Sequence, residues 1–289
     1  MADQQVADVA GGETPAADSE VDEASVAEAP RWRRGRQLRD GSRLYWFKEL
    51  AVGISIYFVY ETVRNLSKGK PSTAFDNAIR VMDWQRAVGI NHEKAIQDWA
   101  LNWFPLIVVS NYYYGIAYIA CTITILVWMY RRQSDDYPLW RNTLAFGTLL
   151  GLVGFATFPL MPPRLLDVMG DGQVFGFVDT LVKYPTFWSF ESSAMQKVSN
   201  QFAAMPSLHC GWALWGAAAL LPRVKTWWMK ALAIAYPTAT IFVVVATGNH
   251  YFLDAVGGAV IFAVGYGMAR VVTRAGRRGR LVSPAMAAR

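Results

Sequence analysis

The fold is decided by a long apolar stretch near the C-terminus, residues 231–269, which reads ALAIAYPTATIFVVVATGNHYFLDAVGGAVIFAVGYGMA. Asp254 is its one formally charged residue, and Gly248 and Asn249 divide it into two apolar parts. As a helix, each part is about long enough to cross the roughly 30 Å hydrocarbon core of a bilayer. The stretch therefore predicts two membrane spans joined by a tight turn.

Four further apolar stretches precede this pair, so six segments are long enough, or nearly so, to span a membrane. They lie near residues 45–63, 104–130, 142–160, 206–221, 229–247 and 250–270. The composition agrees, because 53% of the 289 residues are hydrophobic and only 17% are charged, whereas about a quarter are charged in soluble domains. A soluble core could explain one such segment but hardly six. We expect an all-α, six-helix membrane bundle without sheet, in a domain covering residues 41–271.

The two ends of the chain differ from this domain in charge. The first 30 residues carry eight acidic residues and no Lys, Arg or aromatic residue, and such a composition predicts disorder. Residues 1–40 are interpreted as a disordered tail, acidic and then basic, and residues 272–289 as a basic tail. The N-terminal arginines would suit nucleic acid, but they directly precede a span and fit a topology signal better. The expected partner is a bilayer and not nucleic acid.

Basic residues at the span ends predict which side of the membrane is cytoplasmic. If all six segments cross, the N-terminal arginines, the loops near 131–141 and 223–230 and the C-terminal tail share one side. We assign that side to the cytoplasm, in a multi-pass protein of the cell membrane with both termini inside. Residues 64–103 and 161–205 and the turn at 248–249 then face outward.

The outward segment 64–103 has apolar residues at helical spacing from Thr73 to Asn102, which predicts an amphipathic helix along the membrane interface. His92 lies in a polar part of this segment and is expected to be solvent-exposed. Tyrosines 112–114, at the start of the second span, fit either an aromatic belt or the lining of a headgroup site, and we prefer the belt. Cys121 and Cys210 lie inside apolar segments and are expected to be inert packing residues.

Polar side chains that could perform chemistry gather at the outward ends of the spans. His209 and His250 lie there, where ionisable groups are costly and usually functional. Asp254 follows His250 by four residues, so it can hold the imidazole in one tautomer while the other nitrogen attacks. Ser207 precedes His209 at a helix start, where free N–H groups favour anions. Arg164 offers a planar cation suited to phosphate oxygens. No cofactor or metal is expected, because the sequence has no carboxylate or cysteine cluster at ligand spacing.

Three short motifs resemble those of a known family. They are Pro162-Pro163-Arg164, Pro206-Ser207-Leu208-His209 and His250-Tyr251-Phe252-Leu253-Asp254. In order and spacing they resemble the signature motifs of the type 2 phosphatidic acid phosphatase superfamily, whose members share a six-helix membrane bundle and transfer phosphate through a phosphohistidine. The variant found here looks most like the branch of inositol phosphorylceramide synthases and their bacterial relatives. The resemblance covers about residues 45–270.

The resemblance implies a role for each matching residue. His250 would be the nucleophile, Asp254 its orienting partner and His209 the acid that protonates the leaving oxygen. Arg164 and Ser207 would bind the phosphate. The implied reaction cleaves or transfers a phosphate ester of a lipid at the outer membrane face, with water or an alcohol such as inositol as acceptor.

Two cations of the family pattern are missing from this sequence. A Lys usually stands seven residues before the first-motif Arg, where this chain has Thr157, and an Arg six residues before the third-motif His, where it has Val244. The candidates to replace them, with Lys197 ranked first because it closely precedes Pro206, are Lys183, Lys197, Asn200 and Asn249.

Two hypotheses from other functional classes remain open at this stage. A haem-binding electron carrier would use His209 and His250 as axial ligands, but it gives Arg164, Ser207 and Asp254 no role. A non-catalytic lipid transporter or scaffold would turn over no phosphorylated lipid. Whether an enzyme would be a phosphatase or a headgroup phosphotransferase is also open, because the acceptor is chosen by the shape of the pocket.

Overall fold

A computed structural model describes the backbone of the chain except for residues 1–34, 68, 170–171, 185, 187–199 and 288–289, and its side chains as far as Gly276. The predicted disordered tail therefore lies almost wholly outside the described residues. The chain forms two compact units, residues 1–51 and residues 52–289.

The described part of the first unit contains a small hairpin. Strand β1 (Arg36–Gln37) pairs antiparallel with β2 (Arg43–Leu44). Asp40 and Gly41 make the turn, in which Gly41 has a φ of 79° and Asp40 Oδ1 accepts from Ser42 N at 3.1 Å. The expectation of no sheet was wrong at this point. Asp-Gly is a common hairpin turn, and its signal was hidden among the arginines of the predicted tail.

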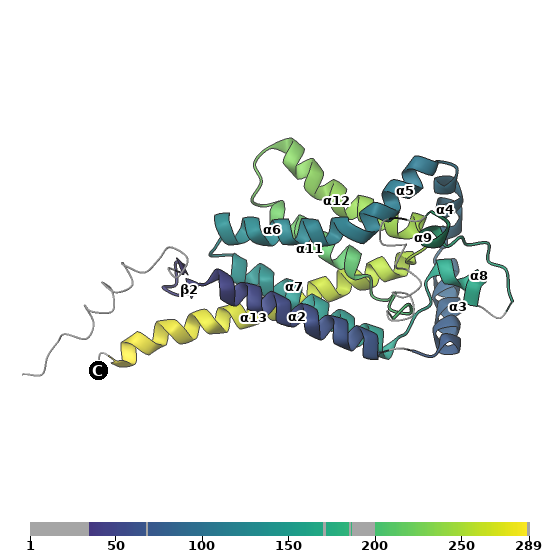
Figure 1. The fold of residues 1–289 in the computed structure, drawn as a ribbon. Helices are drawn as coiled ribbons and strands as arrows, with labels where there is room; N and C mark the ends of the chain where they lie inside the picture. Colours follow the sequence, from purple (N-terminus) through teal and green to yellow (C-terminus); the bar gives the residue numbers. More distant parts are fainter. Residues whose placement is uncertain (1–34, 68, 170–171, 185, 187–199, 288–289) are drawn as a thin grey trace, which may run out of the picture. The chain divides into compact units, whose positions relative to one another are not determined.

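The second unit is mostly helical (Figure 1). Its elements, with α2 beginning in the first unit, are α2 (Trp46–Leu66), α3 (Pro71–Ala87), α4 (Glu93–Leu101), α5 (Phe104–Tyr112), the π-helix η1 (Tyr113–Ala117), α6 (Tyr118–Arg132), α7 (Tyr137–Thr157), the 3₁₀-helix η2 (Pro163–Leu165), α8 (Leu166–Met169), α9 (Thr180–Lys183), α11 (Leu208–Leu220), α12 (Trp227–Ala246) and α13 (Phe252–Ala287). The prediction of a helical architecture is confirmed.

Three helical stretches are long and apolar enough to cross a membrane by length and composition, which indicates a membrane protein. They are Phe104–Arg132, Trp227–Ala246 and Phe252–Gly276. The first is continuous through α5, η1 and α6. The other three predicted spans form helices α2, α7 and α11, of which α11 has only 13 residues. That these three also cross the bilayer stays a prediction.

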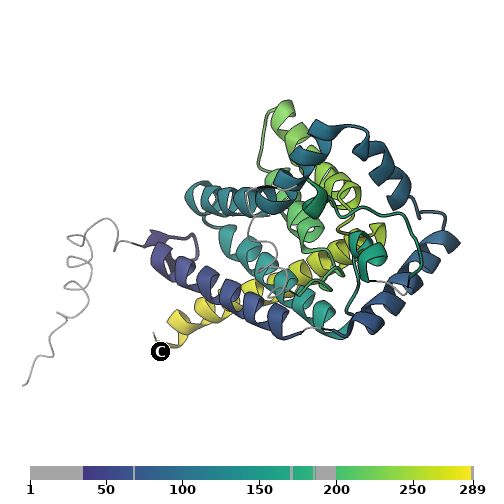
Figure 2. The same cartoon turned by 45° about the vertical axis from the view of Figure 1, so that its right-hand side comes forward.

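The long helices pack closely where glycines allow it. Helices α7 and α13 run side by side (Figures 1 and 2), and α11 packs against α6, α7, α12 and α13. A Cβ on Gly258 of α13 would lie 2.5 Å from Ser207 O, and one on Gly265 would lie 2.8 Å from Gly147 N. Glycines at such contacts let helix backbones approach closely. The start of α11 is thereby held against the first turns of α13.

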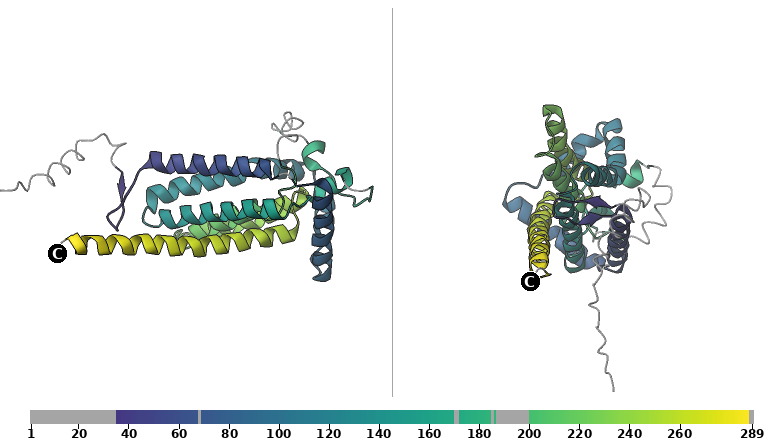
Figure 3. Two further views of the ribbon diagram at one scale, coloured as in Figure 1. Left: turned by 90° about the horizontal axis from the view of Figure 1, so that it is seen from below. Right: turned by 90° about the vertical axis from the view of Figure 1, so that its left-hand side faces the viewer.

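The predicted amphipathic helix from Thr73 to Asn102 is wrong as a single element. It is two helices, α3 and α4, separated by a turn in which Gly89 has a φ of 74°, a conformation that ends a helix. Helix α3 lies across the end of the long helices (Figure 3). Its apolar face, including Phe75 and Val81, packs on a core formed with Leu160 and Tyr251. His92 is exposed, as predicted.

Candidate active site

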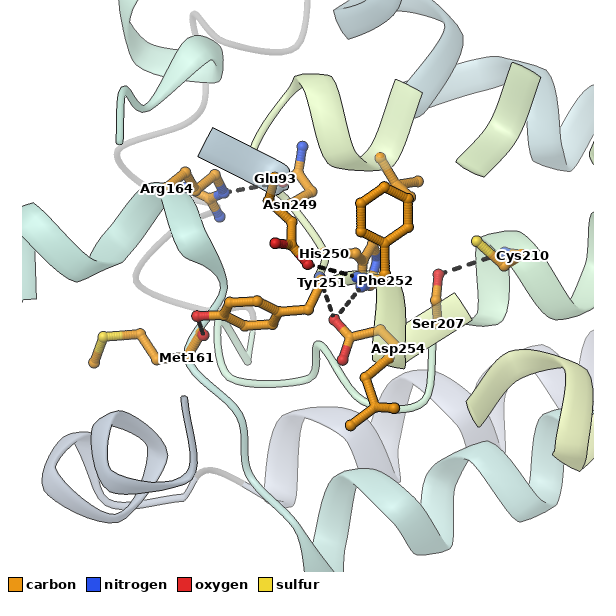
Figure 4. Close-up of polar contacts among 12 residues, drawn as sticks. Glu93, Met161, Arg164, Ser207, Cys210, Asn249, His250, Tyr251, Phe252 and Asp254 are labelled. Carbon is orange, nitrogen blue, oxygen red and sulfur yellow. Dashed lines mark hydrogen bonds and ion pairs between the residues drawn. The ribbon is translucent and has the colours of Figure 1, made fainter. Parts of the chain in front are cut away.

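The turn between α12 and α13 brings His250 and Asp254 together. His250 Nδ1 lies 3.1 Å from Asp254 Oδ2, and the same carboxylate oxygen accepts from Tyr251 N at 2.9 Å (Figure 4). Both side chains are buried. His250 Nε2 is also buried and has no hydrogen-bond partner among the residues that the structure describes. When Nδ1 carries the proton that Asp254 accepts, Nε2 carries a lone pair that is free to attack.

The second histidine reaches this site from the start of α11. Ser207 is the N-cap residue of α11, and its Oγ accepts from Cys210 N at 3.4 Å. Ser207 N donates to Asp254 O at 2.9 Å, which ties the start of α11 to α13. His209, two residues later, has its ring centroid 5.7 Å from that of His250. The structure thus brings the two predicted histidines side by side and gives Ser207 a capping role.

Arg164 is anchored to the turn that precedes His250. Its backbone N–H donates to Gly248 O at 2.8 Å, and its Nε donates to Asn249 Oδ1 at 2.9 Å. Nη1 donates to Asp179 Oδ2 at 2.7 Å. Arg164 is only 9% exposed, and its Nη2 has no partner within the described part of the chain. The guanidinium is therefore held at two of its three nitrogens and keeps Nη2 as a donor for an anion.

Two tyrosines cover His209. The Tyr114 ring stacks on it at a centroid distance of 4.4 Å, and the Tyr118 ring lies at 4.2 Å. Tyr114 belongs to the π-helix η1, a type of turn frequent at functional sites. The preference for an aromatic belt was wrong for Tyr114, because this side chain contacts the predicted catalytic histidine. Spacing along the sequence could not reveal this, since a π-helical turn changes which side chains share a face.

This constellation of two histidines, an aspartate and a buried arginine agrees with a family assignment. The model of the PAP2 superfamily matches residues 79–268, a range that contains all three motifs. The chain belongs to the PAP2 superfamily. No curated protein and no solved structure matches it. Members of this superfamily are generally phosphatases or phosphotransferases. The closer likeness to inositol phosphorylceramide synthases stays a prediction.

The positions of the missing superfamily cations hold residues without charge. Thr157 Oγ1 donates to Val153 O at 2.8 Å within α7. Val244 is buried, and its carbonyl oxygen accepts from Asn249 N at 3.0 Å and from His250 N at 3.1 Å. Val244 therefore shapes the turn that carries His250, while neither residue can bind phosphate as a cation would.

The residues predicted to replace the two missing cations have different environments in the structure. Lys197 lies outside the described residues. Asn249 holds Arg164 with Oδ1 and donates to Thr247 Oγ1 with Nδ2 at 2.8 Å, so both ends of its amide are engaged. Asn200 donates to Ser67 O at 2.7 Å and accepts from Phe202 N at 3.0 Å, as a structural residue does. Lys183 is exposed and lies over the Tyr184 ring.

A cation that the sequence analysis missed lies on α2. The Arg64 guanidinium stacks over the Tyr60 ring at 5.5 Å and pairs with Glu61 Oε1 at 2.8 Å. Its neighbours Tyr60 and Val63 pack against a core cluster that includes Leu208, the residue before His209. Its Nε is buried without a partner in the described part of the chain. Arg64 precedes the first motif by a hundred residues, so no spacing pattern could connect it to the site.

The same geometry argues against the haem hypothesis. An iron porphyrin held by His209 and His250 would need the space between the two rings. Tyr114 stacks on His209 and lies 6.4 Å from His250, so it contacts the region where the macrocycle would have to lie.

Proposed function

We propose that the protein cleaves or transfers a phosphate ester of a lipid through a phosphohistidine at His250. The observation that carries this proposal is the unpartnered Nε2 of His250, beside the ring of His209, with Nδ1 held by Asp254. Phosphoryl transfer depends mainly on positioned cations and donors. Membership of the PAP2 superfamily supports the same reaction class.

The proposed reaction has two steps, and His250, His209, Arg164 and Asp254 perform them. The Nε2 lone pair of His250 attacks phosphorus, and the bond from phosphorus to the lipid oxygen breaks as the N–P bond forms. His209 gives its proton to the leaving oxygen, while Arg164 neutralises charge on the phosphoryl oxygens. In the second step an acceptor hydroxyl attacks phosphorus, His209 takes its proton, and the N–P bond breaks to restore His250. Asp254 stabilises the imidazole cation in both steps.

The acceptor in the second step distinguishes a phosphatase from a headgroup phosphotransferase. Water gives free phosphate, whereas an alcohol such as inositol gives its phosphate monoester. A phosphoinositol lipid would need a phosphodiester donor, whose phosphoinositol group stays on His250 and then passes to a second lipid hydroxyl. The phosphotransferase is the alternative function, because the second and third motifs resemble those of the inositol phosphorylceramide synthase branch.

The test is an assay of the purified full-length protein against phosphatidic acid, other phosphorylated lipids and prenyl diphosphates, with and without inositol. Phosphate release supports a phosphatase, and inositol phosphate in the mass spectrum supports a transferase. No turnover on any of them would contradict the proposal and favour a transporter or scaffold.

We further propose that Arg64 supplies positive charge on the leaving-group side, beyond His209. Arg64→Gln is expected to raise KM about 10-fold with a smaller change in kcat, because one charge-assisted contact contributes about 1.5–3 kcal/mol. The measurement is steady-state phosphate release from lipid in mixed micelles. Arg86→Gln, at an exposed arginine of α3, serves as the matched control. Equal constants for the two variants would remove Arg64 from the site.

We also propose that all six apolar helices cross the bilayer and that the site faces outward. The distribution of basic residues supports this orientation. Val174 is 89% exposed in the outward segment 161–205, and Thr226 is exposed before α12 on the cytoplasmic side. With Cys121 and Cys210 replaced, Val174→Cys is expected to react with a membrane-impermeant thiol reagent on intact cells, whereas Thr226→Cys is not. The reverse pattern would place the site in the cytoplasm.

A further inference from the structure

Helix α4 buries polar side chains on one face. Glu93 and Gln97 are 1% and 0% exposed, and Ala100, on the same face three residues later, is also buried. A carboxylate and an amide so deeply buried are costly unless their polar atoms are hydrogen-bonded. The partners of Glu93 and Gln97 therefore show what this face of α4 stabilises.

Glu93 binds the start of α13. Its Oε1 accepts from Phe252 N at 2.9 Å and from Gln85 Nε2 at 2.6 Å (Figure 4 shows Glu93 beside Phe252). Gln85 Oε1 in turn accepts from Leu253 N at 2.9 Å. Tyr251 N donates to Asp254 Oδ2. The backbone N–H groups of three successive residues at this helix start, 251–253, are therefore all bound by side chains. Such groups have no partner within a helix, so Glu93 and Gln85 fix the first turn of α13, which directly follows His250.

Gln97 binds the segment that holds Arg164. Its Oε1 accepts from Val178 N at 2.9 Å, and its Nε2 donates to Val178 O at 3.0 Å. The next residue, Asp179, pairs with Arg164 Nη1 at 2.7 Å. Gln97 also lies against the turn before His250, because a Cβ on Gly248 would be 2.7 Å from Gln97 Nε2.

We propose that α4 is a positioning element that sets the two halves of the active site through two different side chains. Glu93 positions the nucleophile pair His250 and Asp254 through the start of α13. Gln97 positions the phosphate-binding Arg164 through Val178 and Asp179. The chemistry assigned to these halves rests on the proposed function, whereas the positioning rests on the hydrogen bonds themselves.

The two roles predict changes in different kinetic constants of the purified full-length protein. Glu93→Ala is expected to lower kcat on the order of 10- to 100-fold with little change in KM, because a small displacement of the nucleophile slows the chemical step. Gln97→Leu is expected to raise KM about 10-fold with a smaller loss of kcat, because Arg164 loses its fixed position. Glu93→Gln keeps an acceptor oxygen for both donors and should restore most of kcat. Asp98→Ala, on the exposed side of the same helix, is the control and should match the wild type.

Binding of inorganic phosphate, measured by titration calorimetry, gives a second readout that needs no turnover. Gln97→Leu should weaken it about 10-fold, and Glu93→Ala should leave it unchanged. If the wild type turns over no lipid but shows this difference in phosphate binding, the proposed function fails and the positioning role stands. If the wild type is active and both variants change kcat and KM in the same proportion, the positioning role is overturned. If Glu93→Ala does not fold, Glu93→Asp replaces it, and wild-type kcat in Glu93→Asp would overturn the role of Glu93.

Discussion

Replacing His250 with alanine is expected to lower phosphate release by at least about 10⁴-fold, since the attacking nitrogen is lost and the remaining groups can act only on water. The loss should appear in kcat, because Arg164, the proposed phosphate-binding residue, keeps its contacts with Asn249 and Asp179. The measurement is initial-rate phosphate release from the best lipid substrate of the wild type.

His92→Ala is the matched control for this variant. His92 is the one histidine placed outside the site, and its side chain is exposed at the start of α4. Its removal should leave the rate within about 2-fold of the wild type, as expected for a surface substitution. Near-normal turnover in His250→Ala would show that phosphate is not transferred through this imidazole.

The second large effect is expected at Arg164. In Arg164→Lys, one ammonium group replaces a guanidinium that donates to Asn249 Oδ1 through Nε and to Asp179 Oδ2 through Nη1. A lysine ammonium can bind one of these partners or the phosphate. It lacks the planar guanidinium, whose N–H groups can bind the protein partners and the phosphate at the same time. We expect kcat/KM to fall about 10²-fold, the scale of losing one donor to a developing charge.

Arg223→Lys is the control for a general effect of removing a buried guanidinium. Arg223 pairs with Asp136 at the far end of α11 from His209 and is also largely buried. Its substitution should change thermal stability more than kcat/KM. If Arg164→Lys retains full activity, the phosphate is held by groups other than Arg164.

The helices and the pairing of His250 with Asp254 could be predicted because they depend on local sequence patterns. The apolar segments predicted helices because a membrane span needs a continuous apolar run, and the four-residue spacing of His250 and Asp254 placed them on one helix face. The break between α3 and α4 could have been read from Gly89 and Asn91, which are typical of a helix end.

Other features depend on contacts between distant parts of the chain. Glu93 binds Phe252 across 159 residues and Gln85 binds Leu253 across 168. No periodicity indicates such a pair, and the amphipathic pattern of this segment suggested a membrane surface instead. Tyr114 was misplaced for a related reason, because the π-helical turn that directs it toward His209 leaves no mark in the spacing of apolar residues.

The central claim is that phosphate passes through His250, and trapping the intermediate tests it most directly. The purified protein is mixed with its best lipid substrate, quenched in alkali, in which the N–P bond survives, digested and analysed by mass spectrometry. We predict phosphate on His250 in the peptide that contains the third motif, and none in the same peptide from His250→Ala. Phosphate on another residue, or sustained turnover by His250→Ala, would contradict the account.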